Sequence, residues 1–151
     1  HDILSGNHRI DELQGAILRA KLPYLQTWNA RRREIALAYT ANLRELPGIT
    51  PLPDDPGHVY HIYGIRVQHG RDALAAWLRN SNIEVGIRYS VPIHLQSAKP
   101  AYQSWDGGPF PQAEAFAQEI LNLPMYPELT DAQVQYVIEQ VREWTMRKDP
   151  R

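Results

Sequence analysis

The sequence predicts an α+β fold, in which a thin sheet of few strands is covered by helices. Three observations predict it. Apolar residues recur at helical spacing in several stretches, one short run is rich in β-branched and aromatic residues, and the helices and strands follow one another without an internal repeat. With 151 residues, the chain is long enough to bury an ordinary core as one domain.

The N-terminal third predicts two helices. Residues 10–22 carry apolar side chains at helical spacing and are followed by a proline. A second helix is expected over residues 27–46, where Pro47 and Gly48 end the pattern. The proline-rich run at 51–57 suits neither helix nor strand and is expected to be a loop.

The middle of the chain predicts two strands. Residues 59–67 form the clearest strand, because β-branched and aromatic residues dominate this run. A short helix over 72–79 follows, and residues 83–87 form the second strand candidate. Residues 90–108 contain prolines and an Asp-Gly-Gly turn signal, so they are expected to be irregular.

The C-terminal third predicts two more helices. Pro111 sits where a first helical turn tolerates proline, and apolar residues follow it at helical spacing. The last helix begins near Thr130, which forms a capping-box pattern with Gln133 ahead of one apolar stripe. Because two strands make a thin sheet, we expect a third short strand near residues 121–123.

Composition excludes several classes of protein. Lys and Arg total 16 against 17 Asp and Glu, whereas a nucleic-acid binder usually carries a basic excess. The basic run at 31–33 is expected on the solvated face of a helix. The absence of cysteine excludes disulfides and thiolate sites, and no apolar run reaches the roughly 18 residues of a membrane span. We therefore expect a cytoplasmic protein that binds neither nucleic acid nor membrane.

Common catalytic fingerprints are missing from the sequence. It contains no G-x-S-x-G elbow, no G-x-G-x-x-G and no P-loop. His58 and His61 lie three residues apart, a spacing that points their rings to opposite faces of a strand. We therefore expect ordinary histidines there and no metal site.

Two polar clusters are candidates for binding an anion. Asn7 and Arg9 precede a helix, where Asn7 either caps the helix or joins Arg9 in binding an anion at its positive end. Arg88, Tyr89 and His94 follow a predicted strand in a proline-stiffened segment. They can bind phosphate or sugar hydroxyls, or the segment is a surface loop with Tyr89 tucked into the core. The residues alone leave these alternatives open.

Four segments carry a resemblance that covers almost the whole chain. They are residues 5–18 (SGNHRIDELQGAIL), 59–63 (VYHIY), 88–96 (RYSVPIHLQ) and 119–136 (EILNLPMYPELTDAQVQY). The third is similar to the pattern H-Y-P-x-P-x-H-x-Q, and the fourth to a closing run that contains L-S-L-P. In this order they resemble the DegT/DnrJ/EryC1/StrS family of pyridoxal-phosphate-dependent sugar aminotransferases.

The resemblance implies the small C-terminal domain of a fold type I enzyme similar to aspartate aminotransferase, with a short antiparallel sheet covered by helices. Residues 1–26 would lead from the large domain, and residues 27–151 would form the small one. Such enzymes move an amino group from glutamate to a nucleotide-linked keto sugar, using pyridoxal 5'-phosphate (PLP) held by a lysine of the large domain. Lys21, Lys99 and Lys148 are the only lysines and do not match that lysine's context. This piece, which lacks an initiating methionine, is expected to be inactive alone and to carry no catalytic residue.

The resemblance also implies binding residues, because the family's homodimer builds each active site from two subunits. Asn7 matches the asparagine that reaches the partner's cofactor phosphate, and Arg9 matches an arginine near the substrate. Tyr89 and Arg88 match a tyrosine and a histidine that help bind the nucleotide sugar, and His94 matches a second histidine at the same edge. Arg88 keeps a positive charge but cannot act as a proton shuttle.

Two alternatives to the aminotransferase stay open. A sugar dehydratase of the same family uses pyridoxamine phosphate and differs at the lysine position, which lies outside these residues. The other alternative is a non-catalytic binding module.

Overall fold

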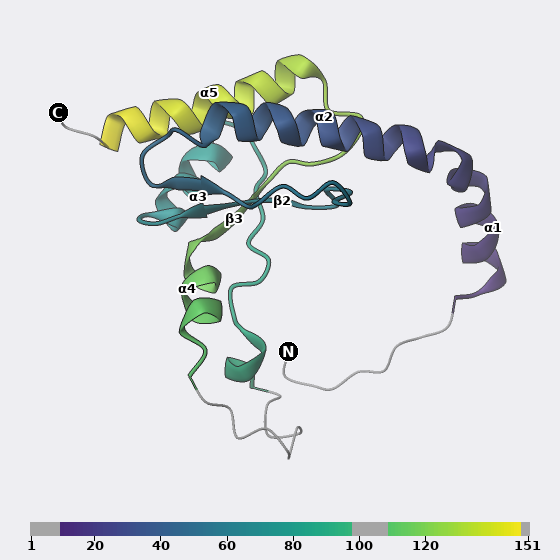
Figure 1. Ribbon diagram of the computed structural model, residues 1–151, viewed down its shortest axis with the longest axis horizontal. Helices are drawn as coiled ribbons and strands as arrows, with labels where there is room; N and C mark the ends of the chain where they lie inside the picture. Colours follow the sequence, from purple (N-terminus) through teal and green to yellow (C-terminus); the bar gives the residue numbers. More distant parts are fainter. Residues whose placement is uncertain (1–9, 98–108, 149–151) are drawn as a thin grey trace.

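The computed structural model describes residues 10–97 and 109–148. At its centre lies a three-stranded antiparallel sheet with the strand order β1-β2-β3. Its strands are β1 (Ile49–Pro51), β2 (Tyr63–Val67) and β3 (Ile120–Leu123). Helices cover this sheet (Figure 1), so the α+β prediction and the third strand are confirmed.

The pairing of β2 with β3 sorts their side chains between two faces of the sheet. Ile65 pairs with Leu121, and both side chains are fully buried in the main core. The neighbouring pair, Gly64 and Asn122, points to the opposite face because side chains alternate along a strand. The second face is therefore the one that carries a buried polar side chain.

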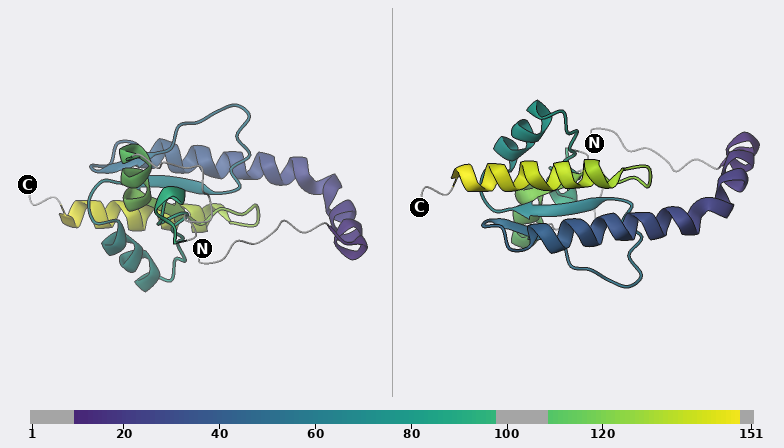
Figure 2. Two further views of the ribbon diagram at one scale, coloured as in Figure 1. Left: turned by 90° about the horizontal axis from the view of Figure 1, so that it is seen from below. Right: turned by 90° about the horizontal axis from the view of Figure 1, so that it is seen from above.

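Three helices pack around the apolar core. α2 (Leu25–Leu43) and α5 (Asp131–Lys148) lie side by side over the sheet, and α3 (Arg71–Asn80) lies next to α5 (Figure 2). Each contributes an apolar stripe, and each large buried side chain adds about 1.5–3 kcal/mol of stability. The buried apolar side chains of these helices include Ile35, Tyr39, Leu43, Leu74, Leu78, Val134, Val137, Ile138, Val141 and Trp144.

The other side of the sheet carries α4 (Pro111–Glu119), which lies below the sheet in Figure 1. Ala117 is buried where α4 packs against the sheet. Residues 84–97 descend beside α4 and include a 3-10 turn, η2 (Ile93–Leu95). This pair of segments forms the edge on which the predicted site residues lie.

An N-terminal arm, defined here as α1 (Glu12–Lys21) and the 3-10 turn η1 (Leu22–Tyr24), extends beyond the body of the molecule (Figure 1). α1 begins after Asp11, whose Oδ1 accepts from the Gln14 backbone N–H at 2.7 Å in a capping box. Neither element buries a residue. The exposed apolar side chains of the arm are Leu13, Ile17, Leu18, Leu22 and Tyr24.

The strand expected over residues 59–67 is shorter than predicted and begins only at Tyr63. Tyr60 adopts a left-handed conformation with φ 49°, and a residue in this conformation cannot be part of an extended strand. Its backbone N–H donates to Nδ1 of His58 at 2.8 Å instead of entering the sheet. The prediction of an extended strand there is wrong, because a local turn satisfies this backbone.

Two further strand predictions also need correction. Residues 83–87 form only an isolated bridge to the sheet, between Gly86 and Asn122. In contrast, β1 was not among the expected strands, since its three residues are too few to show alternation.

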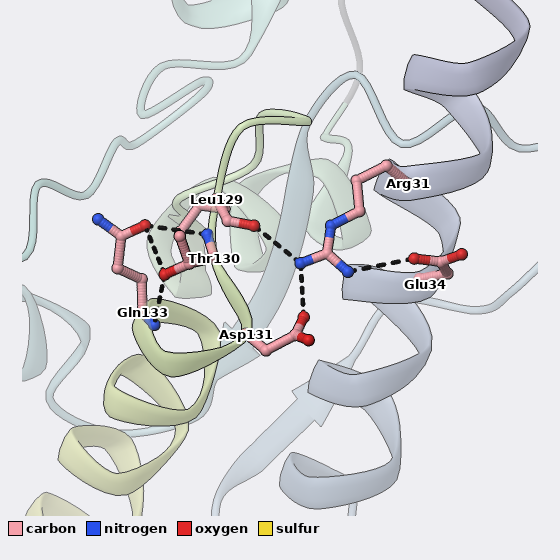
Figure 3. A network of polar contacts seen from close by, with 6 residues as sticks. All are labelled: Arg31, Glu34, Leu129, Thr130, Asp131 and Gln133. Carbon is pink, nitrogen blue, oxygen red and sulfur yellow. Dashed lines mark hydrogen bonds and ion pairs between the residues drawn. The ribbon is translucent and has the colours of Figure 1, made fainter.

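The prediction that the arginines at 31–33 form a solvated helix face is wrong. Arg31 donates to the backbone oxygen of Leu129 at 2.8 Å and to Oδ1 of Asp131 at 2.6 Å (Figure 3). Arg33 pairs with Asp54 at 3.2 Å. These half-buried side chains connect α2 to the start of α5 and to the loop after β1.

The start of α5 confirms the predicted capping box. The Thr130 backbone N–H donates to Oε1 of Gln133 at 2.9 Å, and the Gln133 backbone N–H donates to Oγ1 of Thr130 at 3.3 Å (Figure 3). Arg31 thus binds a helix end at which the capping box already satisfies the Thr130 and Gln133 backbone donors.

Candidate functional site

The candidate site lies on the segment that follows the isolated bridge. The Gly86 backbone N–H donates to the backbone oxygen of Asn122 at 3.0 Å, and the Asn122 backbone N–H donates to the backbone oxygen of Gly86 at 2.8 Å. The Arg88 backbone N–H then donates to the side-chain Oδ1 of Asn122 at 2.9 Å. β3 therefore fixes the backbone at the point where the predicted binding residues begin.

Arg88 and Tyr89 both face outward from this segment. Tyr89 is 69% exposed, so the alternative that places its ring in the core is wrong. Within residues 10–97 and 109–148, no carboxylate pairs with the exposed Arg88 guanidinium. Arg66 differs, because it is held by Glu119 at 2.7 Å. Arg88 is thus a cation that remains available to an anionic ligand.

A cavity of about 1030 Å³ opens between residues 88–96 and α4. Its lining is mostly apolar, with Arg66 and Arg88 as its two cations. A cavity of this size accommodates a ring system, and a guanidinium at its border can bind phosphate bidentately. The cavity brings Arg88, Tyr89 and His94 to one place, as the sequence predicts.

His94 occupies a different environment from the other two predicted residues. It is 6% exposed, its Nε2 lies 2.9 Å from Oε1 of Glu114, and its ring lies 4.9 Å from that of Phe110. The hydrogen bond with His94 lowers the pKa of Glu114, and a second bond from the Phe110 backbone N–H at 3.3 Å acts in the same direction. This histidine already has a protein partner for its ring nitrogen.

The other predicted binding residues, Asn7 and Arg9, lie outside the described residues. The structure nevertheless decides one alternative for Asn7. Asp11 caps α1, so the alternative that Asn7 caps this helix is wrong.

The described residues provide no site for a metal ion. His58 accepts a hydrogen bond from the Tyr60 backbone, and the centroid of its ring lies 4.1 Å from that of the Tyr60 ring in a tilted arrangement. Across residues 10–97 and 109–148, no three His, Cys, Asp or Glu side chains gather as a metal site requires.

In the same part of the chain, no helix is both long and apolar enough to span a membrane.

Lys21 is the last residue of α1 on the exposed arm and is not among the residues that line the cavity beside Arg88. The described residues around the cavity include no lysine that could anchor a cofactor covalently. What they offer is a cation and a phenol at an exposed edge.

Sequence reasoning did not single out Asn122 or Glu114. The closing pattern L-S-L-P has serine at the position of Asn122. This replacement of serine by a larger amide, in a strand that is buried, is the signal that could have identified Asn122. Glu114 gave no such signal, because its relation to His94 depends on the fold bringing α4 beside the segment.

Comparison with known proteins identifies relatives of the whole chain. The model of the DegT/DnrJ/EryC1/StrS aminotransferase family matches residues 1–142. The chain is 40% identical over 155 residues to a dTDP-3-amino-3,4,6-trideoxy-alpha-D-glucose transaminase of Streptomyces venezuelae. This match covers 99% of this chain and 39% of that protein. The chain is 42% identical over 150 residues to a pleiotropic regulatory protein of Geobacillus stearothermophilus, with 95% and 39% coverage.

Solved structures of aminotransferases also resemble this chain. The chain superposes on S. venezuelae DesV with a TM-score of 0.85 and 38% identity, over 99% of this chain and 40% of that one. It superposes on a DegT DnrJ EryC1 StrS aminotransferase of Brucella abortus with a TM-score of 0.79 and 32% identity, over 91% and 36%. The chain therefore spans about two fifths of the length of the proteins it matches.

Proposed function

The chain belongs to the DegT/DnrJ/EryC1/StrS aminotransferase family, and from that membership we propose that it is the C-terminal part of a PLP-dependent enzyme. The whole enzyme moves an amino group from glutamate to a nucleotide-linked keto sugar. The observation that carries the proposal is Arg88, an exposed cation beside Tyr89 that has no carboxylate partner among the described residues, on a chain 40% identical over 99% of its length to a sugar transaminase.

This piece contributes to binding the substrate rather than to the chemistry. The planar Arg88 guanidinium suits a phosphate oxygen pair, and the Tyr89 hydroxyl can donate to a sugar or phosphate oxygen. PLP, when bound, supplies the electron sink for amino transfer. The lysine that anchors it lies in the rest of the enzyme, so the 151-residue piece alone is inactive.

The enzyme is a homodimer in which this piece completes the partner's site. Residues 1–26 lead from the large domain, and residues 27–151 form the small domain. The arm supports this division, since its apolar side chains are exposed in the described residues and need a covering surface.

Asn7 reaches the partner's cofactor phosphate, and Arg9 lies near the substrate. The capping of α1 by Asp11 supports a ligand-binding role for Asn7, since the helix does not need it.

The test uses the full-length protein that contains this chain. A visible absorbance band after PLP addition, lost on borohydride reduction, indicates a lysine-bound cofactor. Amino-donor turnover is then measured with glutamate, and the second half-reaction with nucleotide-linked keto sugars. Retained pyridoxamine phosphate without the lysine-bound form would instead indicate the dehydratase, and no cofactor binding would indicate a binding module.

The role of Arg88 is tested in the same protein. Arg88→Ala is expected to raise KM for the nucleotide sugar about 10- to 150-fold, as the loss of a charge-assisted hydrogen bond of roughly 1.5–3 kcal/mol implies. Arg88→Lys restores the charge without the planar fork and recovers part of this loss. An unchanged KM in both variants would contradict the proposed binding edge.

A further inference from the structure

We propose that Asn122 and Glu114 are positioning residues that hold the two ends of the segment 88–94 and so orient Arg88 and Tyr89 toward the substrate. The inference rests on the proposed function, because it concerns the same binding edge. It assigns a role to two side chains that do not themselves face the ligand.

Asn122 holds the first end of the segment. Its side chain is 8% exposed, and its Oδ1 accepts the Arg88 backbone N–H at 2.9 Å. Gly64 is its partner across β2 and β3. A Cβ on Gly64 would lie 3.4 Å from Nδ2 of Asn122 and 2.9 Å from side-chain atoms of Ile120 and Leu52. Asn122 thus supports the Arg88 backbone directly from β3.

Glu114 holds the second end of the segment. Its Oε1 binds Nε2 of the buried His94 at 2.9 Å and also accepts from the Phe110 backbone N–H at 3.3 Å. α4 is thereby connected to the segment six residues after Arg88. His94 acts as the attachment point, which accounts for its burial at an edge where Tyr89 is exposed.

The residues between the two attachment points depend on them. Arg88 and Tyr89 are exposed and have no side-chain hydrogen bond to other described residues. Val91 and Ile93 are also exposed, at 45% and 61%. Because Arg88 and Tyr89 have no side-chain partner among the described residues, their direction depends on the backbone, which Asn122 and Glu114 hold at either end.

The experiment uses the full-length enzyme and separates its two half-reactions. Asn122→Ala and Glu114→Ala are each expected to raise KM for the nucleotide sugar about fivefold, the factor for one hydrogen bond of roughly 1 kcal/mol. The half-reaction with the amino donor alone is expected to keep its rate. Glu114→Gln retains an accepting oxygen and is expected to recover most of the loss.

Two exposed positions provide matched controls. Asn80→Ala, at the end of α3, and Glu45→Ala, after α2, remove the same groups outside the segment, β3 and α4, and should leave both half-reactions unchanged. The Glu114 side chain is 37% exposed, so its variants are expected to fold even if Asn122→Ala does not.

The outcomes distinguish the two proposals. If Arg88→Ala raises KM but Asn122→Ala and Glu114→Ala only lower the melting temperature, the positioning role is overturned and the proposed function stands. If Arg88→Ala leaves KM unchanged, the binding edge itself is wrong. A rise in KM for all three variants, with an unaffected amino-donor half-reaction, supports the positioning role.

Discussion

Arg88 and His94 lie six residues apart on one segment, yet they meet opposite environments. Arg88 is exposed and has no carboxylate partner among the described residues, whereas His94 is buried against Phe110 and bound to Glu114. The resemblance to the family predicts a role in substrate binding for both. At the scale of the residue, only the environment separates a group that can bind a ligand from one that holds the backbone.

A prediction at this scale concerns Asn7. In the full-length enzyme, Asn7→Ala is expected to weaken PLP retention, because its amide would bind the cofactor phosphate, and to leave the melting temperature nearly unchanged. Asp11→Ala is the matched control, because loss of the α1 cap costs about 1 kcal/mol of helix stability without touching the cofactor. Retention is measured by equilibrium dialysis. Full retention by Asn7→Ala would contradict its assignment.

At the scale of the element, Arg31 of α2 binds the start of α5 in addition to the apolar packing of the two helices. Arg31 is 26% exposed and bonds the backbone oxygen of Leu129, while its partner Asp131 is 91% exposed. An ion pair with so exposed a carboxylate adds little, so the bond to Leu129 is the larger contribution. Removing the Arg31 guanidinium leaves the backbone oxygen of Leu129 without this donor.

Arg31→Met is therefore expected to lower the free energy of unfolding by about 1–2 kcal/mol, since methionine keeps the apolar stem but loses the donors. Urea unfolding of this chain measures the change. Arg44→Met, at an exposed position after α2, serves as the control and is expected to have little effect. Equal stabilities of the two variants would show that the Arg31 contacts do not stabilise the fold.

Elements with a long periodic pattern could be predicted from the sequence, and short ones could not. The apolar stripe of α5 and its capping box at Thr130 are local signals, and the structure confirms both. β1 and the bridge at Gly86 involve too few residues to show a pattern and form because a neighbouring strand offers hydrogen bonds. The contacts of Asn122 and Glu114 depend on tertiary structure in the same way.

At the scale of the whole molecule, two buried phenols make the core sensitive to high pH. Tyr39 and Tyr63 lie with ring centroids 5.0 Å apart between α2 and β2. Burial raises the pKa of Tyr63 from 10.0 to about 12 and raises the pKa of Tyr39 further. The folded protein therefore retains phenolic protons that the unfolded chain loses.

Because these folded-state pKa values are raised, the stabilisation is fully present below pH 10.0 and is lost as the pH rises through about 12. Each phenol contributes a slope of about 1.4 kcal/mol per pH unit in this range. Urea unfolding between about pH 9 and pH 12 measures the loss, and Tyr63→Phe is expected to make it shallower. A stability that does not change over this range would contradict the burial of both hydroxyls.

The arm and α2 follow one another as helix without an intervening loop, from Glu12 through η1 to Leu43. In the α-helical parts of this connection, each residue turns the helix by about 100° and advances it by about 1.5 Å. Inserting or deleting one residue between the arm and Ile35 would rotate the apolar side of the arm by more than a quarter turn relative to the core. The number of residues in this connection therefore fixes the angular phase between the two ends, and length variation is far less acceptable here than in the loop at 52–59.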